Sequence, residues 1–287
     1  MMRAAVLFSG GKDSVYATYI AQQQHFDVVG TITIIPSVSD SYMFHVPNAR
    51  FASTISSAMG VPNVTAEVPS EQDELRVLSQ AIGSSGVDAV ITGAIASDYQ
   101  MFRINFVCEE LGVKVFSPLW HKDQEMLLRE IVGAGFDVRM VGVAADGLDE
   151  RWLGRRIDPK AIDDLVALRR KRRINVSGEG GEFETIVLDG PDFRRRLEMA
   201  SSSVNWAGME TSRRFTSASP SGFADSSFFL TTSNRSAGSQ SMTLSLDCTS
   251  SDVVLPTLAY RNSNESLNVL MREVFSLASL SVSNACE

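Results

Sequence analysis

The sequence predicts an α/β protein with a parallel sheet, followed by a smaller region and a serine-rich tail. Apolar runs alternate with segments of helical period through the first half of the chain. A glycine turn stands between the first apolar run and the first helical segment. After residue 200 the chain contains no lysine and is rich in serine, asparagine and threonine. We therefore expect domains at 1–145, 146–200 and 201–287.

The elements follow one another in the order that a parallel sheet requires. Strands are expected at 4–8, 28–35, 89–92 and 138–143, and helices at about 13–23, 49–59, 72–84, 99–111, 123–133 and 160–172. This alternation implies helices on both faces of the sheet. Ligands bind outside the carboxyl ends of the strands in such folds, so functional residues are expected in the loops that follow them.

The first of these loops has the features of a phosphate-binding turn. Residues 9–14 read Ser-Gly-Gly-Lys-Asp-Ser. Gly10 and Gly11 allow close approach of the backbone to an anion, and the N–H groups at the start of the next helix face the same anion. Lys12 adds a mobile charge, and Ser9 and Ser14 add hydroxyl donors.

The spacing excludes two commoner phosphate loops. In a Walker A loop a serine or threonine follows the lysine, but here Asp13 follows Lys12, and Val6 stands where the first glycine belongs. The Gly-x-Gly-x-x-Gly spacing of dinucleotide folds is also absent from this turn. An ordinary glycine turn with solvated charges is the alternative interpretation.

Composition limits the class of protein. The chain has 287 residues, 44% of them hydrophobic, and a net charge of −8, which argues against a stable nucleic-acid partner. It shows no apolar stretch of membrane-spanning length and no signal pattern, so we expect a cytoplasmic protein without a membrane partner. Its three cysteines lack Cys-x-x-Cys spacing, so we expect no metal site built from them.

A second group of polar residues lies at 178–185, which reads Gly-Glu-Gly-Gly-Glu-Phe-Glu-Thr. Glu179, Glu182 and Glu184 repel one another unless a cation lies between them. We expect Thr185 to begin a short strand that continues to residue 188. An exposed acidic loop is the alternative.

A third group follows the strand expected at 89–92. Ser97 and Asp98 could be explained as helix caps alone, but Gly93, Tyr99 and Arg103 could not. We therefore expect these residues to contact the adenine or ribose of a bound nucleotide, or the substrate that accepts the transferred group.

Two further motifs remain open. The loop at 43–48 contains His45 and Asn48, and a lone histidine of this kind is either structural or functional. Residues 169–173 read Arg-Arg-Lys-Arg-Arg at the end of an expected helix. Cations favour a helix C-terminus, so a solvated end is one interpretation, and contact with an acceptor protein or its RNA is the other.

Taken together, these motifs resemble the diphthine–ammonia ligase family, within the PP-loop ATP pyrophosphatase superfamily. The motifs that carry the resemblance are 9–14, His-Val-Pro-Asn at 45–48, Gly-Ala-Ile-Ala-Ser-Asp-Tyr-Gln at 93–100 with Arg103, Pro-Leu-Trp at 118–120, Trp-Leu-Gly-Arg at 152–155, 178–185 and Asp-Gly-Pro at 189–191. The resemblance covers about 1–197, and the tail resembles neither the short ending of compact relatives nor the folded additions of longer ones. We expect 201–265 to be largely disordered and about 266–275 to form one amphipathic helix.

The resemblance implies ATP-dependent amidation of diphthine on translation elongation factor two. ATP adenylates the diphthine carboxylate, pyrophosphate leaves, and ammonia from ammonium displaces AMP to give diphthamide. It implies ATP and Mg²⁺ as cofactors and an adenine nucleotide alpha hydrolase-like fold. An RNA-modifying PP-loop enzyme and a non-catalytic ATP-binding module remain as alternatives.

The same resemblance assigns roles to residues. Lys12 and Asp13 are implied as catalytic, with Ser9, Gly10, Gly11, Lys12, Asp13, Ser14 and Gly93 binding the nucleotide. The residues implied to bind substrate are His45, Asn48, Ser97, Asp98, Tyr99, Arg103, Glu179, Glu182, Glu184 and Thr185. The acidic residues at 179–184 would suit the trimethylammonium group of diphthine or ammonium itself.

Overall fold

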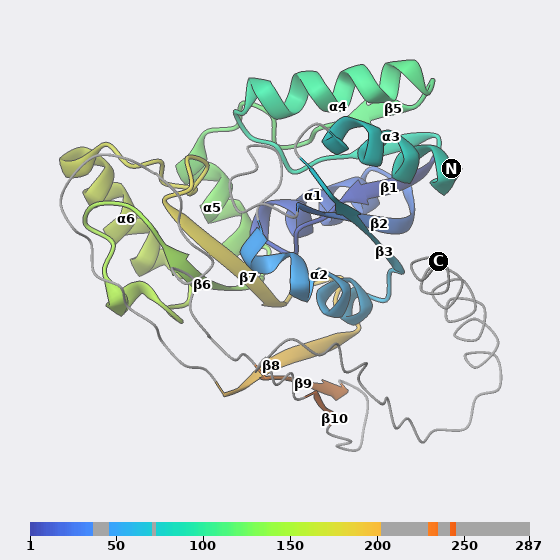
Figure 1. Cartoon of the computed structure of the whole chain (residues 1–287). Coiled ribbons are helices and arrows are strands. Elements are labelled where there is room, and N and C mark those ends of the chain that lie inside the picture. The colour runs from blue at the N-terminus through green and yellow to red at the C-terminus, as the bar shows by residue number, and fades with distance from the viewer. Residues whose placement is uncertain (37–45, 71–72, 202–228, 235–241, 245–287) are drawn as a thin grey trace. The chain divides into compact units, whose positions relative to one another are not determined.

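The computed structural model describes residues 1–36, 46–70, 73–201, 229–234 and 242–244. Within them, five parallel strands form one sheet in the order β3-β2-β1-β4-β5 (Figure 1). These strands are β1 (Arg3–Leu7), β2 (Asp27–Pro36), β3 (Asn63–Val68), β4 (Ala89–Ile91) and β5 (Lys114–Phe116). The predicted α/β class is confirmed.

The helices alternate with these strands as predicted. They are α1 (Lys12–Gln23), α2 (Val46–Met59), α3 (Glu74–Ser85), α4 (Asp98–Glu110), α5 (Gln124–Gly133), the short 3-10 helix η2 (Glu150–Trp152) and α6 (Pro159–Arg172). Each described α-helix begins within three residues of its predicted start.

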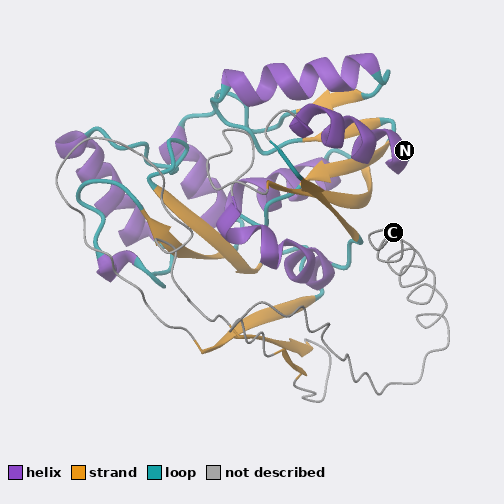
Figure 2. Ribbon diagram, viewed as in Figure 1, coloured by secondary structure: helices purple, strands orange, loops and turns teal. Residues whose placement is uncertain are grey.

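Helices cover both faces of the sheet (Figure 2). Successive residues of β1 point to opposite faces, so Ala4 and Val6 join one apolar cluster and Ala5 joins another. The cluster around Ala4 includes Ile55 of α2, and the cluster around Ala5 includes Leu78 of α3. Both clusters are apolar, which explains why the strands of this sheet read as continuous hydrophobic runs.

The strand order reverses beside β1. The chain passes from β1 outward to β2 and β3 and then crosses to β4 on the other side of β1. The loops after β1 and β4 therefore leave the sheet side by side at its carboxyl edge. This is the position at which open α/β sheets bind ligands.

One strand expected in this sheet belongs elsewhere. β6 (Asp137–Val143) pairs antiparallel with β7 (Phe183–Asp189) in a separate two-stranded sheet. The expectation that 138–143 extends the parallel sheet is therefore wrong. An apolar run shows that a strand is buried but does not encode its partner, and Val138 and Met140 are fully buried in this second sheet as well. The strand expected at 185–188 is confirmed within β7.

Two strands of the parallel sheet were not expected. β3 is an edge strand with several exposed residues, and its Val64 is 57% exposed. β5 is only three residues long. Neither has the sustained apolar run that marks a buried strand.

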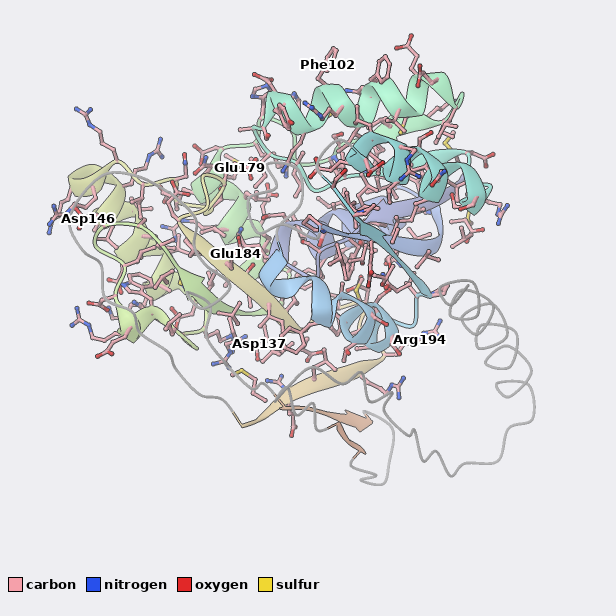
Figure 3. All side chains as sticks on the ribbon, viewed as in Figure 1. Phe102, Asp137, Asp146, Glu179, Glu184 and Arg194 are labelled. Carbon is pink, nitrogen blue, oxygen red and sulfur yellow. The ribbon has the colours of Figure 1, made fainter. Side chains whose placement is uncertain are left out.

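A third sheet begins after β7. β8 (Arg195–Ser201) pairs antiparallel with β9 (Phe229–Asn234), which pairs with β10 (Met242–Leu244). The buried carboxylate of Asp137 connects β6 to β8, because it accepts from Arg139 at 2.9 Å and from Arg196 at 2.6 Å (Figure 3). β9 and β10 lie inside the segment expected to be largely disordered. The rest of that segment and the helix expected at 266–275 lie outside the described residues.

Candidate functional site

The glycine loop joins the end of β1 to the start of α1. Gly10 has a φ of +77°, a conformation that favours glycine, and a Cβ at this position would also push on Ile55 Cδ1, 2.7 Å away. The hydroxyl of Ser14 accepts from Ser9 N–H at 3.3 Å and donates to the carbonyl of Gly11 at 3.1 Å. The two serines therefore hold the shape of the loop from within.

Lys12 and Asp13 form the charged part of this loop. The Lys12 side chain is buried and its Nζ lies 2.8 Å from Asp13 Oδ2 and 5.4 Å from the centre of the Phe183 ring. The other oxygen of Asp13, Oδ1, is buried and has no hydrogen-bond partner within the described ranges. An unpaired buried carboxylate oxygen is costly, so this atom is placed to accept a donor or a cation.

The acidic loop at 178–185 packs directly against the glycine loop. The backbone N–H of Lys12 donates to Thr185 Oγ1 at 3.1 Å. Glu179 Oε1 accepts from the N–H groups of Ala96 and Ile95 at 3.0 and 3.4 Å. The three segments expected from sequence to carry the site therefore meet. Figure 3 labels Glu179 and Glu184 of the acidic loop.

The carboxylate of Glu179 lies in a low-dielectric and negatively charged environment. Burial raises its pKa, and the charge of Asp13 raises it further. The Lys12 ammonium and the N–H groups of Ala96 and Ile95 oppose both effects. A cation bound next to Glu179 would relieve the repulsion between the two carboxylates.

Glu182 is oriented differently from Glu179. Its Oε1 accepts from the N–H and the side-chain amide of Asn175 at 2.8 and 2.7 Å, and its Oε2 accepts from Gly180 N–H at 2.8 Å. These three bonds hold the acidic loop closed on itself. Glu182 does not line the cavity described below.

The segment after β4 supplies the third side of the site. A Cβ at Gly93 would lie 2.7 Å from the carbonyl carbon of Asp13, so only glycine permits this approach of the two loops. Ser97 caps α4 by accepting from Gln100 N–H at 3.4 Å. Asp98 and Tyr99 are exposed, and the Arg103 guanidinium stacks on the Tyr99 ring at 3.8 Å.

These segments enclose a cavity of about 400 Å³ at the carboxyl ends of the central strands. The expected site residues that line it are Ser9, Gly11, Lys12, Asp13, Ser14, Gly93, Ser97, Glu179, Glu184 and Thr185. Those placed outside its lining are Gly10, Asp98, Tyr99, Arg103 and Glu182. His45 lies outside the described residues, and Asn48 lies in the first turn of α2, where its side chain is not described.

The cavity also has lining residues that sequence reasoning missed. Ile32, Thr33 and Ile34 contribute from the second half of β2. Gln100, which belongs to the motif expected at 93–100, also lines the cavity. The hydroxyl of Thr33 donates to the carbonyl of Phe8 at 2.8 Å. The carboxyl-end position of the β2 residues was the available signal, because ligand contacts gather at that edge.

Neither a cluster of metal ligands nor a membrane-spanning helix is present in the described ranges. No group of three or more His, Cys, Asp or Glu side chains is arranged to hold a metal ion in this part of the chain. Among the described helices, none has both the length and the apolar character needed to cross a lipid bilayer.

The fold and this cavity define the class of protein: an α/β protein with a glycine loop at the switch point of a parallel sheet, beside a cavity. Comparison with known proteins makes the class specific. The model of the diphthamide synthase N-terminal domain matches residues 2–115, and that of the C-terminal domain matches residues 123–217. The second match continues past residue 197, so the expected end of the resemblance is corrected to about 217.

Curated relatives lead to the same family. The human protein named diphthine–ammonia ligase is 31% identical over 227 residues, covering 71% of this chain and 85% of the relative. The zebrafish protein of that name is 31% identical over 219 residues, covering 68% of this chain and 86% of the relative. The match to the Saccharomyces cerevisiae protein of the same name is 33% identical over 231 residues and covers 34% of that longer protein. The chain belongs to the diphthine–ammonia ligase family, a family of ligases.

Proposed function

We propose that this chain converts diphthine on translation elongation factor two into diphthamide, using ATP and ammonium. The observation that carries the proposal is the hydrogen bond from Lys12 N–H to Thr185 Oγ1 at 3.1 Å. It joins the loop that suits a triphosphate to the acidic loop that suits a cationic acceptor. Relatives named for the same ligation support it. Because the acceptor works in translation, the proposal places the reaction in the cytoplasm.

The glycine loop supplies the groups that a triphosphate needs. α1 begins at Lys12, directly after Gly10 and Gly11, so the positive end of the helix dipole favours an anion here. The N–H of Gly11 already donates to Ser9 Oγ at 3.3 Å and that of Lys12 to Thr185 Oγ1 at 3.1 Å, so these two bonds hold the loop open for the anion. The Lys12 ammonium would stabilise the negative charge that builds on departing pyrophosphate. Binding of ATP would draw this ammonium from Asp13 toward the phosphates.

Asp13 is suited to the metal ion that accompanies ATP. Its Oδ1 is buried without a hydrogen-bond partner in the described residues, and carboxylate oxygen is a ligand that Mg²⁺ favours. When bound with the nucleotide, Mg²⁺ supplies charge neutralisation on the phosphates. The second oxygen of Asp13, Oδ2, has Lys12 as its partner until the nucleotide binds.

The proposed reaction has two steps. In the first, a carboxylate oxygen of diphthine attacks the α-phosphorus of ATP, the bond from that phosphorus to the bridging oxygen breaks, and pyrophosphate leaves. In the second, ammonia forms a bond to the acyl carbon, AMP leaves with the electron pair, and the nitrogen loses a proton. Adenylation is needed because the charge of a free carboxylate repels nucleophiles and its oxygen is a poor leaving group.

The acidic side of the cavity suits the two cationic reactants. Glu179 and Glu184 both line it, and both would attract the trimethylammonium group of diphthine or ammonium. Glu179 is fixed by the two backbone N–H groups that donate to its Oε1. We therefore assign Glu179 to cation binding, close to the glycine loop.

The test is an assay of AMP and pyrophosphate release from ATP. The full chain is incubated with diphthine-bearing elongation factor and ammonium, and each of the two is omitted in turn. Release of both products that requires both additions supports the proposal. Production of ADP, or turnover that ignores the elongation factor, would contradict it, and nucleotide binding without any AMP would favour a non-catalytic module.

A further inference from the structure

The C-terminal end of α6 carries charge that the proposed site does not use. All five cations at 169–173, hereafter the basic end of α6, are exposed. Arg172 pairs with Asp146 at 2.9 Å, whereas Arg169, Arg170, Lys171 and Arg173 have no ion pair within the part of the chain that is described. Figure 3 shows Asp146 beside this helix. Four neighbouring cations without carboxylate partners form a surface that attracts anions.

A hollow adjoins this surface. It has a volume of about 400 Å³ and lies between η2 and α6, with Trp152, Arg155 and Lys171 in its lining. The Trp152 side chain is buried, and the Arg155 guanidinium stacks over its ring at 4.3 Å. Of the lining cations, Arg155 pairs with Asp164 and Arg151 pairs with Asp149, so Lys171 is the one that remains available to an incoming carboxylate.

The basic end of α6 lies close to the cavity along the chain. Residue 173 precedes Glu179 by six residues, so their Cα atoms are separated by at most about 22 Å. The intervening segment is fixed, since Ile174 and Val176 are buried and Asn175 N–H donates to Glu182 at 2.8 Å. A protein interface of ordinary size, about 800 Å² per partner, spans such a distance.

We propose that the basic end of α6 and the hollow over Trp152 form a docking surface for an acidic segment of the acceptor protein. The inference rests on the proposed function, because it takes the acceptor to be a protein whose modified side chain enters the cavity. Docking here would fix the acceptor beside the acidic loop. It would also supply, through the protein surface, binding energy that one side chain in the cavity cannot provide.

The surrounding charges favour an acidic protein segment over RNA. Asp146 pairs with Arg172, Asp149 pairs with Arg151 beside the hollow, and Asp164 lines the hollow, so the positive surface is short. The net charge of the chain is −8, which repels an extended polyanion. A short acidic segment can contact the cations at the end of α6 without contacting the surrounding carboxylates.

The experiment compares two lysine substitutions of equal charge. Lys171→Glu lies in the docking surface, and Lys114→Glu lies at the start of β5, away from the carboxyl edge of the sheet. Both lysines are exposed and have no ion pair among the described residues. We expect Lys171→Glu to raise the KM for the acceptor roughly fivefold at low salt and Lys114→Glu to leave it within about twofold. Raising the salt from about 50 to about 200 mM should shrink the difference.

The readouts separate the docking inference from the proposed function. Direct binding of the acceptor to the full chain is measured beside AMP release, and binding of a nonhydrolysable ATP analogue verifies that each variant is folded. Suppose that the acceptor binds in a salt-sensitive way, that Lys171→Glu weakens this binding, and that the unsubstituted chain releases no AMP. This result would support the docking surface and reject the proposed reaction. Acceptor-dependent AMP release with equal KM values for the two variants would reject docking alone. A difference that disappears after nuclease treatment of the acceptor would also overturn the inference, in favour of RNA.

Discussion

The backbone N–H of Lys12 donates a hydrogen bond of 3.1 Å to the hydroxyl of Thr185, although the two residues are 173 positions apart. Lys12 begins the helix after the glycine loop, and Thr185 lies in β7 at the end of the acidic loop. The bond therefore couples two loops that come from different sheets. If one of them moves, the other loses a fixed partner.

Replacing Thr185 by valine should weaken this coupling. Valine has nearly the same shape but no hydroxyl, so the Lys12 N–H would lose its acceptor in a buried position. We expect a loss of about 1–3 kcal/mol in the free energy of unfolding and weaker binding of an ATP analogue. Denaturant unfolding and nucleotide titration measure the two effects. Thr185→Ser keeps the hydroxyl and should restore most of both; equal losses in the two variants would assign the effect to packing.

Replacing Lys12 by alanine should lower turnover strongly and leave the fold intact. The substitution removes the ammonium that is placed to stabilise charge on pyrophosphate. Loss of one such electrostatic group costs roughly 10²–10³ in kcat. Initial rates of AMP release and a circular dichroism spectrum test the two parts of the prediction, with Lys114→Ala as the control for loss of a lysine. A Lys12→Ala variant with the turnover of the unsubstituted chain would remove Lys12 from the mechanism.

The substitution Gly93→Ala should disturb the contact between the loops after β1 and β4. The new Cβ would lie 2.7 Å from the Asp13 carbonyl carbon and 2.8 Å from Ser14 N, and backbone atoms cannot move aside without shifting the glycine loop. We expect a loss of roughly 1–3 kcal/mol in unfolding free energy and weaker nucleotide binding. Gly133→Ala is the matched control, because nothing lies within 4 Å of its Cβ. Equal unfolding free energies and nucleotide affinities in the two variants would show that the two loops can separate enough to accept the methyl group.

Glu179→Gln should change the affinities for nucleotide and cation in opposite directions. The substitution removes a negative charge near Lys12 and Asp13 while keeping an acceptor for Ala96 N–H. Less repulsion should leave ATP binding equal or tighter, and the KM for ammonium or the acceptor should rise. Glu198→Gln is the comparison, since that carboxylate is exposed and lies outside the cavity lining. Parallel weakening of nucleotide and cation binding by Glu179→Gln would indicate a structural role.

The sequence predicted the parts of the site that depend on local geometry. Gly10 and Gly93 each occupy a position where a side chain would collide with a neighbour, and such glycines stand out in a strand-to-helix turn. The lining by Thr33 was not predicted, because its residue type carries no signal of a cavity and only its position near the carboxyl end of β2 could have indicated one.

Pairings between distant segments could also not be predicted from the sequence. The hydrophobicity of β6 is compatible with either sheet, and only its partner β7 decides which one it joins. Glu182 carries the same charge as Glu179, but its hydrogen bonds to Asn175 and Gly180 stabilise the conformation of its own loop. Identical residue types in one motif thus take different roles according to the nearest backbone donors.

The buried carboxylate of Asp192 should make the stability of the fold depend on pH, and Asp192 lies outside the cavity lining. Both of its carboxylate oxygens are buried, and no other described residue donates a hydrogen bond to them. Burial raises its pKa from 3.8 to about 6, and its own backbone N–H opposes this only in part. Between pH 3.8 and about 6, Asp192 holds a proton in the folded state that it has lost in the unfolded chain, so the free energy of unfolding falls as the pH rises through this range. Above about pH 6 the ionised Asp192 destabilises the fold, and below pH 3.8 this destabilisation is absent.

Replacing Asp192 by asparagine removes this titration. The stability of Asp192→Asn relative to the unsubstituted chain should increase by about 2 kcal/mol between about pH 4.5 and about pH 7.5. Urea unfolding at several pH values gives the difference directly. Glu198→Gln, at an exposed carboxylate of β8, serves as the control and should show little change with pH. A constant difference between Asp192→Asn and the unsubstituted chain over this range would show that the carboxylate reaches water or a partner in solution.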